Sequence, residues 1–371
     1  MTKEKYCSKW GEKNNRVKDF FSKFGFILNI GAAFLLLLAY LAPFVPPDLF
    51  WPLSFFGLAY PYLVFINFIF LVIWVLQPSK RLLLPLATLL LGFYNFTNTF
   101  QLIPQTQSHD HGIMVMSFNA HGFSSDLRNK RANTPKVLAY FKSTGAEIIC
   151  LQEASRAKVG PLSAQGITDA LAGIGYFQQA SIAAGASSVT FSKYPIINFG
   201  EIRFPGSSNL VLFSDIKISR RQTIRVYNCH LQSYSIDPDD YSIIDSLSAG
   251  PGGKQIKDAR RVSYKLKTGF KIRALQARKV ADHIQHSPYP VIVCGDFNDT
   301  PVSYAYRKVR GELKDTFVEA GWGISNTYNG VLPSFRIDYI LCSQKFEVRN
   351  YQRDRVYLSD HFPVRSQLFL E

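Results

Sequence analysis

The first hundred residues contain long apolar stretches that are free of charged side chains. Residues 26–46 and 55–76 each reach the roughly 20 apolar residues that a transmembrane helix needs, and a third stretch, 82–103, is more polar toward its end. The pattern predicts two transmembrane helices and favours a third. A buried hairpin of a soluble domain would look similar. A cleaved signal peptide is disfavoured, because a polar segment of about 25 residues precedes the first stretch.

The positive charges around these stretches predict their orientation. Residues 1–25 form a basic tail, Lys80 and Arg81 separate the second stretch from the third, and the loop between the first two has neither Lys nor Arg. The positive-inside rule therefore places the tail and the 77–81 loop in the cytoplasm. Three spans would put the rest of the chain outside the cytoplasm, and two would leave it inside. The absence of Lys and Arg between residues 82 and 127 favours three.

After a linker, 104–111, the pattern changes to strand-like runs with polar ends, several of which alternate apolar and polar residues. Residues 112–371 are enough for one large α/β domain. Helical periodicity marks 134–145, with Thr134 as the N-cap, and about 255–285, with an interruption expected at Thr268 and Gly269. These elements predict two packed mixed sheets with helices outside. The strand-like runs are 112–119, 146–153, 187–192, 209–218, 223–231, 290–298, 336–342 and 364–370.

The five cysteines do not suggest a disulfide framework. Cys7 lies in the basic tail. The other four each lie inside an apolar strand-like run, so we expect them to be small buried hydrophobic residues. They are Cys150, Cys229, Cys294 and Cys342.

The net charge of +15 comes partly from the tail and partly from residues 254–279, where ten Lys or Arg accompany one acidic residue, Asp258. This segment could follow a nucleic-acid backbone or dock on anionic lipid headgroups. It could equally be the solvated face of an amphipathic helix. Its few aromatic residues, Tyr264 and Phe270, give no platform for stacking bases.

Six of the strand-like runs begin or end with a residue that can bind a metal or move a proton. Taken singly, each has an ordinary explanation, such as a turn cap or a satisfied histidine. Taken together they are more informative, because polar ends of strands in one open sheet converge on one rim, where ligands bind. The residues are Asn119, Glu153, His230, Asp296, Asn298, Asp338, Asp360 and His361.

These residue types limit the chemistry. Asn, Asp and Glu oxygens are hard ligands, which suit Mg²⁺, Mn²⁺ or Ca²⁺ rather than Zn²⁺. The sequence has no zinc-type Cys/His spacing, no G-x-S-x-G nucleophile elbow and no G-x-x-x-x-G-K-[ST] phosphate loop. A metal that neutralises a phosphate, an Asp that activates water and a His that faces the developing charge together indicate metal-assisted phosphoester hydrolysis.

The ordered motifs "SFN", "LQE", "NCHL", "GDFND", "RIDYI" and "SDH" resemble the endonuclease/exonuclease/phosphatase superfamily over residues 115–369. That superfamily includes deoxyribonucleases, neutral sphingomyelinases and inositol polyphosphate 5-phosphatases. The resemblance implies a four-layer α/β/β/α sandwich and a hydrolase that uses Mg²⁺ or Mn²⁺. With "SKYP" at 192–195 and the apolar N-terminal stretches, the chain particularly resembles membrane-anchored members from bacteria of the Bacteroides type.

The resemblance also implies a role for each motif residue. The metal ligands would be Asn119, Glu153 and Asp360. Asp296 would orient or deprotonate the attacking water, and Asn298 would hold that water or a phosphate oxygen. His361 would contact the scissile phosphate, with Asp338 fixing its tautomer, and His230 would be the second phosphate-facing histidine. Arg336 could bind substrate phosphate or pair with a nearby carboxylate.

The chain departs from one branch of the superfamily two residues after Asn119. Abasic-site endonucleases carry an Asp there, and this chain has His121. The departure argues mainly against abasic-site repair. His109 and His111 could bind metal or belong to a solvated linker, and Asp299 and Thr300 are interpreted as turn residues.

The sequence leaves the substrate open between nucleic acid, lipid headgroups and simple phosphate esters, since the superfamily acts on all three. Membrane tethering favours a lipid headgroup or an extracellular nucleic acid. A catalytically inactive binding or sensor module is the alternative, and no protein partner is predicted. "NDT" at 298–300 is formally an N-glycosylation acceptor inside the candidate site, so an extracytoplasmic domain fits a bacterial envelope, and its periplasmic side, better than a secretory lumen.

Overall fold

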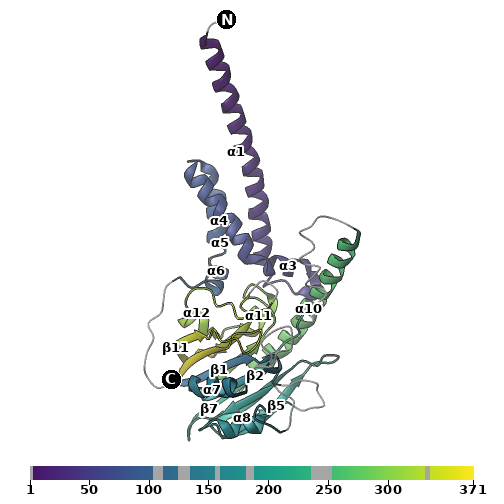
Figure 1. Ribbon diagram of the computed structural model, residues 1–371, viewed down its shortest axis with the longest axis vertical. Coiled ribbons are helices and arrows are strands. Elements are labelled where there is room, and N and C mark those ends of the chain that lie inside the picture. The colour runs from purple at the N-terminus through teal and green to yellow at the C-terminus, as the bar shows by residue number, and fades with distance from the viewer. Residues whose placement is uncertain are drawn as a thin grey trace.

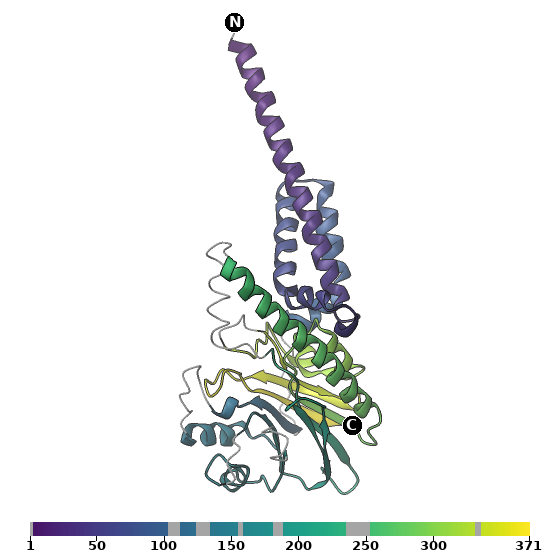
Figure 2. The same cartoon turned by 90° about the vertical axis from the view of Figure 1, so that its right-hand side faces the viewer.

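The N-terminal third of the molecule is a small helical bundle that stands on the rest of the chain (Figures 1 and 2). The computed structural model describes residues 3–102, 112–123, 134–154, 159–180, 188–234, 253–330 and 335–371. The long helix α1 (Lys3–Leu41) carries the N-terminus far from the sheets, and α4 (Tyr60–Leu76) and α5 (Leu83–Leu91) lie along its second half. Short helices occupy the junction with the sheets: α2 (Pro47–Phe50), α3 (Pro52–Leu58) and α6 (Phe93–Thr99), while η1 (Lys80–Leu82) links α4 to α5.

Among the residues that the structure describes, one helix, the Ser22–Leu41 part of α1, is long and apolar enough to cross a membrane. The count rises to three if each of two bent pairs is a single span: α3 with α4, bent by 65°, and η1–α5 with α6, bent by 60°. The first predicted span, 26–46, was too long at its end. α1 stops at Leu41, because prolines at 43, 46 and 47 cannot continue a helical hydrogen-bond ladder.

Polar side chains tie α1 to α4. The indole Nε1 of Trp74 donates to Asn29 Oδ1 at 3.1 Å, and Asn67 Nδ2 donates to the Ala32 carbonyl at 3.0 Å. Buried amide hydrogen bonds of this kind hold helices together in lipid, where the hydrophobic effect between helices is weak.

The rest of the chain forms two six-stranded mixed sheets. The first has the order β11-β12-β1-β2-β4-β3, and the second β5-β6-β7-β8-β10-β9. The first sheet contains β1 (Ile113–Asn119), β2 (Ile148–Gln152), β3 (Tyr176–Gln179), β4 (Val189–Ser192), β11 (Phe346–Arg353) and β12 (Val364–Leu370). The second contains β5 (Ile196–Arg203), β6 (Leu210–Lys217), β7 (Thr223–His230), β8 (Val291–Asp296), β9 (Lys314–Asp315) and β10 (Asp338–Cys342).

Alternate residues of the central strands pack into different layers, because successive side chains of a strand point to opposite faces. Ile148 of β2 and Ile292 of β8 meet between the sheets, whereas Ile149 faces the helices of the first sheet and Val293 those of the second. The helices over the first sheet are α7 (Thr134–Thr144) and α8 (Ala164–Ala170). Those over the second are α10 (Gly253–Gln285) and α11 (Tyr304–Arg310), while α12 (Thr316–Ala320) packs against β11 of the first sheet and β10 of the second. Three apolar layers between four structural layers confirm the predicted α/β/β/α sandwich.

The four cysteines outside the basic tail are buried and free, as predicted. The interruption expected near residue 268 was wrong, since α10 is one continuous helix. The Thr268 hydroxyl donates back to the Tyr264 carbonyl, and Gly269 gives room to the Tyr234 ring, which a Cβ atom would meet at 3.0 Å. Both residues therefore serve packing within an unbroken helix. Four strands, β3, β5, β9 and β11, lie outside the predicted runs; β9 has only two residues, and β5 exposes much of its apolar surface.

Candidate active site

The polar strand ends of both sheets meet at one rim of the sandwich. In the first sheet β1 and β2 are parallel, so Asn119 lies beside Gln152 and close to Glu153. In the second sheet Asp296 is the register partner of both His230 on β7 and Asp338 on β10. A hydrogen bond of 3.0 Å from Asn119 Nδ2 to Asp296 Oδ2 joins the two sheets at this point.

The backbone around this rim adopts rare conformations. Among the described residues, the non-glycine residues with positive φ are His121, Phe123, Glu153 and Asn298, and three of these are candidate site residues or their neighbours. Each such residue costs of order 1–3 kcal/mol, and such strain is typical of functional sites. Gly295 has φ 142°, and a side chain there would collide with the Cys229 carbonyl. Glycine thus lets β7 and β8 approach closely enough to set Asp296 beside His230.

His361 lies between two buried carboxylates. Its Nδ1 is 2.9 Å from Asp338 Oδ2 and its Nε2 is 3.9 Å from Asp296 Oδ2, while the Tyr328 ring packs against the imidazole edge to face. Burial alone would lower the pKa of His361, but the charges of Asp338 and Asp296 outweigh it and raise that pKa to about 10. The imidazole is therefore a cation at neutral pH.

The charged form of Asp296 is disfavoured, whereas that of His361 is favoured, because burial and the charge of Asp338 both act against ionisation of Asp296. They raise the pKa of Asp296 to about 6, against the opposing influence of the two histidines. Its Oδ1 accepts the backbone N–H of Asn298 at 2.7 Å, and its Oδ2 accepts the Asn298 amide at 3.1 Å. The result is a carboxylate held in place at neutral pH whose affinity for a proton is well above that of an ordinary Asp.

On the other side of the rim, Asn119 and His230 both contact the Glu153 carboxylate. Asn119 Nδ2 donates to its Oε1 at 3.3 Å, and His230 Nε2 lies 3.3 Å from the same oxygen. Burial would raise the pKa of Glu153, but the contact with His230 and the charges of His230 and His121 lower it to about 2. The pKa of His230 is raised in turn, since the Glu153 carboxylate outweighs the effect of burial.

Asp360 pairs with a residue that the sequence singled out as a departure. His121 Nδ1 lies 2.9 Å from Asp360 Oδ1. Burial would raise the pKa of Asp360, but the bond to His121 lowers it, and the same bond raises the pKa of His121. His121 therefore places an imidazole of raised pKa where an Asp would have added a negative charge.

The donor set fits a hard divalent cation on the Glu153 side. Both contacts of the Glu153 carboxylate use Oε1, so Oε2 has no partner among the described residues, and the side chain is 40% exposed toward the rim. Asn119 directs its amide N–H groups at the carboxylates of Glu153 and Asp296, and its side chain would have to rotate to offer its oxygen to a cation. A second set, Asp296, Asp338 and His361, presents ligand atoms within 4.8 Å of one another. Because His361 Nδ1 already bonds Asp338 there, we assign the metal to the Glu153 side and interpret this set as an imidazole oriented between two carboxylates.

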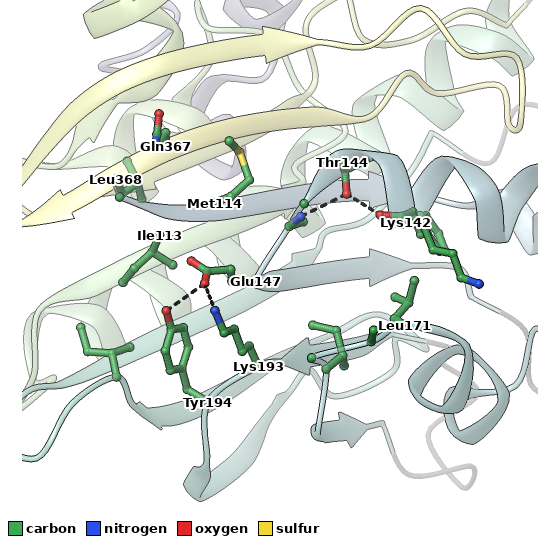
Figure 3. Close-up of a pocket in the computed structure, with 18 of the residues that line it drawn as sticks. Ile113, Met114, Lys142, Thr144, Glu147, Leu171, Lys193, Tyr194, Gln367 and Leu368 are labelled. Carbon is green, nitrogen blue, oxygen red and sulfur yellow. Dashed lines mark hydrogen bonds and ion pairs between the residues drawn. The ribbon is translucent and has the colours of Figure 1, made fainter. Parts of the chain in front are cut away.

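A cavity of about 590 Å³ opens over these groups. It is lined by Asn119, His121, Glu153, Asp296, Asn298, Asp360 and His361, together with apolar residues from distant elements. A larger cavity, about 1100 Å³, lies at the other ends of β1 and β2 (Figure 3). There Glu147 is occupied by Lys193 at 2.6 Å and by Tyr194 at 3.1 Å, and none of the candidate catalytic residues is present.

Arg336 does not join the other predicted site residues. Its side chain is 4% exposed and its Nη1 bonds both oxygens of Asp315, at 3.1 and 2.8 Å, while Nη2 donates to the Asn98 carbonyl. The guanidinium is also flanked by the Phe317 and Tyr339 rings. The prediction that Arg336 binds substrate was therefore wrong. Arg336 instead pairs with a carboxylate, that of Asp315, which was the alternative. His109 and His111 lie outside the described residues.

Three neighbours of the site were not predicted. Tyr328 packs on His361, and Arg273 of α10 pairs with Asp299 at 3.1 Å while stacking on Tyr234. Asp299, interpreted from the sequence as a turn residue, is thus a buried ion-pair partner. The basic segment gave the one available signal for Arg273, but helical periodicity alone does not say which of its cations is buried.

Comparisons with known proteins identify the family of the sandwich domain. A model of the Endonuclease/Exonuclease/phosphatase family matches residues 116–361, and a model of a domain of unknown function, DUF8431, matches residues 21–99. No curated protein is significantly similar to the chain.

Among solved structures, an endonuclease/exonuclease/phosphatase from Beutenbergia cavernae is similar with a TM-score of 0.50 and 18% identity, over 70% of this chain and 72% of that one. One from Bacteroides vulgatus has a TM-score of 0.48 and 19% identity, over 71% and 100%. A mannosyl-6-phosphatase from Bacteroides thetaiotaomicron has a TM-score of 0.43 and 16% identity, over 70% of this chain and 100% of that one. At these identities the likeness concerns the fold alone, and only the first superposition is close enough to support it.

Proposed function

This chain belongs to the endonuclease/exonuclease/phosphatase family, and from that premise we propose that it is a membrane-anchored, divalent-metal-dependent phosphoester hydrolase. The observation that carries the proposal is an unbroken series of contacts at the rim. It runs from Glu153 through Asn119 and Asp296 to His361 and Asp338. The series joins a low-pKa carboxylate, a carboxylate of raised pKa and a buried imidazolium, and a binding module would need none of these protonation states.

The protonation states suggest a role for each residue. Asp296 takes a proton from the attacking water, whose oxygen bonds to phosphorus as the phosphorus–oxygen ester bond breaks. The His361 imidazolium, fixed by Asp338, faces the charge that develops on the phosphoryl oxygens. His230, whose pKa the Glu153 carboxylate raises, gives a proton to the departing oxygen. Asn298 holds Asp296 in place through two hydrogen bonds.

A divalent cation, Mg²⁺ or Mn²⁺, held by Glu153 and Asp360 with Asn119 beside them, would neutralise phosphate charge as a Lewis acid. The hard oxygen donors and the free Glu153 Oε2 support this choice of ligands. His121, paired with Asp360, keeps that carboxylate oriented toward the same corner of the cavity.

The test uses the full-length protein in detergent with Mg²⁺ or Mn²⁺ and a panel of soluble phosphate monoesters and diesters, plasmid DNA, RNA and phospholipids. Glu153→Gln should lower kcat by about 100-fold or more, because it removes charge from the metal site. Glu147→Gln is the matched control, since Glu147 precedes the same strand at its other end and pairs with Lys193 outside the site. Equal activity of Glu153→Gln and the wild type would refute the metal assignment. Inactivity of the wild type on every substrate would favour the binding-module alternative.

We also propose that the chain is a multi-pass protein with its sandwich outside the cytoplasm. Tyr60 at the start of α4 and Thr99 at the end of α6 lie beside Val302 of the sandwich, and the N-terminus lies at the far end of the bundle (Figure 1). That arrangement fits an odd number of crossings with the basic tail inside. A C-terminal alkaline phosphatase fusion should be active in a bacterial host, and a fusion at residue 79 should be silent. The reverse result would place the sandwich in the cytoplasm.

A further inference from the structure

The cavity over the catalytic groups has one polar wall and one apolar wall. The polar wall consists of the candidate catalytic residues. Most of the apolar wall comes from two elements that are remote in sequence, the α3–α4 bend and α10, and Phe335 and Ile337 add to it. The residues from the bend and α10 are Phe55, Leu58, Ala59, Tyr62, Val262 and Leu266. The region that carries the membrane-spanning helices thus forms part of the same cavity that holds Glu153, Asp296 and His361.

Specific contacts fix the α3 wall to the sandwich. Gly57 lies so close to the Val302 carbonyl that any side chain there would collide with it. The Phe55 ring packs edge to face on Phe270 of α10 at 5.4 Å, and Arg278 of α10 makes two hydrogen bonds of 3.0 Å to Asp48. These contacts hold the apolar wall in a fixed position beside the candidate catalytic residues.

The junction is rich in the residue types that mark a membrane surface. Trp51, between α2 and α3, packs on Phe55 and accepts Lys267 of α10 over its ring at 5.1 Å. Tryptophan and basic residues are typical of the boundary between lipid and water. The cavity therefore opens where the bundle meets the bilayer surface.

An exposed apolar stripe leads from the cavity along α4. Tyr62 lines the cavity, and Phe65, Ile66 and Ile69 follow it at spacings of three, four and seven residues, which places all four on one face of the helix. All four side chains are exposed in this chain. The apolar surface is thus continuous from the catalytic cavity into the membrane-spanning part of α4.

The cavity lining contains no Lys or Arg among the described residues. A nucleic-acid strand needs cations along its backbone, so this lining is poorly suited to one. An amphipathic ligand with a single phosphoester and a hydrocarbon chain matches both walls, and a volume of about 590 Å³ is in the usual range for a ligand of that size.

We propose that the substrate is a membrane lipid: its phosphoester reaches Asp296 and His361 while its hydrocarbon chain lies against the α3–α4 bend and Leu266 and leaves along the α4 stripe. This proposal rests on the proposed function and names the substrate class of the same site. It gives the membrane helices a part in substrate recognition in addition to anchoring.

The test measures kcat/KM of the full-length protein in lipid nanodiscs on alkyl p-nitrophenyl phosphates and alkyl phosphates from methyl to dodecyl, each below its micelle concentration. Wild-type kcat/KM should rise with chain length, by up to about fourfold for each methylene that becomes buried. A flat series would overturn the proposal, as would faster hydrolysis of plasmid DNA or RNA than of any alkyl ester.

Two variants of α10 give a matched comparison. Leu266→Glu places a charge in the apolar wall and should lower the ratio of dodecyl to methyl kcat/KM by about tenfold or more. Leu275→Glu adds the same charge at a position on the same helix that is 57% exposed and outside the cavity, and it should keep the wild-type ratio. Equal ratios in both variants would overturn the proposal. If Leu266→Glu fails to fold, Leu266→Asn replaces it.

A binding measurement removes the dependence on turnover. A dodecyl phosphate with a diazirine at its chain end should crosslink to residues 55–69, which include the α4 stripe, or to residues 262–266 in Glu153→Gln, and excess dodecyl phosphate should compete. Crosslinks elsewhere would overturn the proposal. The two failures are distinguishable: a flat chain-length series that still needs Glu153 refutes the lipid substrate alone. Hydrolysis that does not need Glu153, or no hydrolysis at all, refutes the proposed function as well.

Discussion

Helix α10 carries two arginines that each pair with an aspartate from another part of the chain. One pair is buried and the other is partly exposed. Arg273 bonds Asp299 at 3.1 Å with side-chain exposures of 0% and 6%, and Arg278 bonds Asp48 at 3.0 Å with exposures of 32% and 42%. Asp299 directly follows Asn298 in the candidate catalytic loop. We predict that Arg273→Met strongly destabilises the protein and lowers activity, whereas Arg278→Met does little to stability.

The magnitudes follow from burial. Removing one partner of a buried pair costs about 3–5 kcal/mol, because the other charge stays buried without compensation. An exposed pair contributes about 0.2–1 kcal/mol. Since a domain of this size changes its melting temperature by about 2–4 °C per kcal/mol, Arg273→Met should lower the Tm by about 10 °C and Arg278→Met by less than about 4 °C.

The pH dependence supplies a second check. Burial already raises the pKa of Asp299 against the opposing charge of Arg273, and loss of Arg273 should raise it further. A carboxyl whose folded pKa exceeds its unfolded value loses stability as pH rises toward and through the folded pKa. The Tm difference between Arg273→Met and the wild type should therefore be smaller at pH 5 than at pH 8.

Thermal unfolding followed by intrinsic fluorescence in the same detergent would compare the wild type, both single variants and the double variant Arg273→Met with Asp299→Asn. The double variant should regain part of the lost stability, because no buried charge remains unpaired. Similar Tm losses in the two single variants, or a larger loss for Arg273→Met at pH 5, would refute the reasoning.

Three further outcomes are expected. Asp338→Asn should lower kcat by about 10²–10⁴-fold with little change in KM, because it removes the group that orients and charges His361; an unchanged kcat would contradict that role. Gly295→Ala should fail to fold, since its Cβ would collide with the Cys229 carbonyl, whereas Gly175→Ala, which has open space, should fold normally by circular dichroism. Chelation by EDTA should abolish hydrolysis and Mg²⁺ or Mn²⁺ should restore it, while activity that persists in EDTA would exclude the proposed cation.

Local sequence was enough to predict the sandwich and most of the site. Strand periodicity depends on neighbouring residues, and a polar residue at a strand end can be recognised without knowing which strand lies beside it. For that reason Asn119, Glu153, His230, Asp296 and the "RIDYI" and "SDH" motifs could be placed at one rim before their contacts were known.

Tertiary structure decided what depends on elements that are distant in sequence. Arg336 carries no local sign that it pairs with Asp315 and the Asn98 carbonyl instead of a phosphate. Likewise, the periodicity of α10 could not show that Arg273 is buried. Burial of a charge is decided by the partner that happens to face it, and that partner lies on another element.

The polar and apolar walls of the cavity differ in the same way in how far the sequence predicts them. The sequence by itself determined the candidate catalytic groups, because their types and positions at strand ends are local properties. That Tyr62 and Leu266 share a cavity with Glu153 was decided only when the α3–α4 bend docked against α10 and the Val302 carbonyl. Such docking is set by the fit of packed surfaces, which no single stretch of the chain contains.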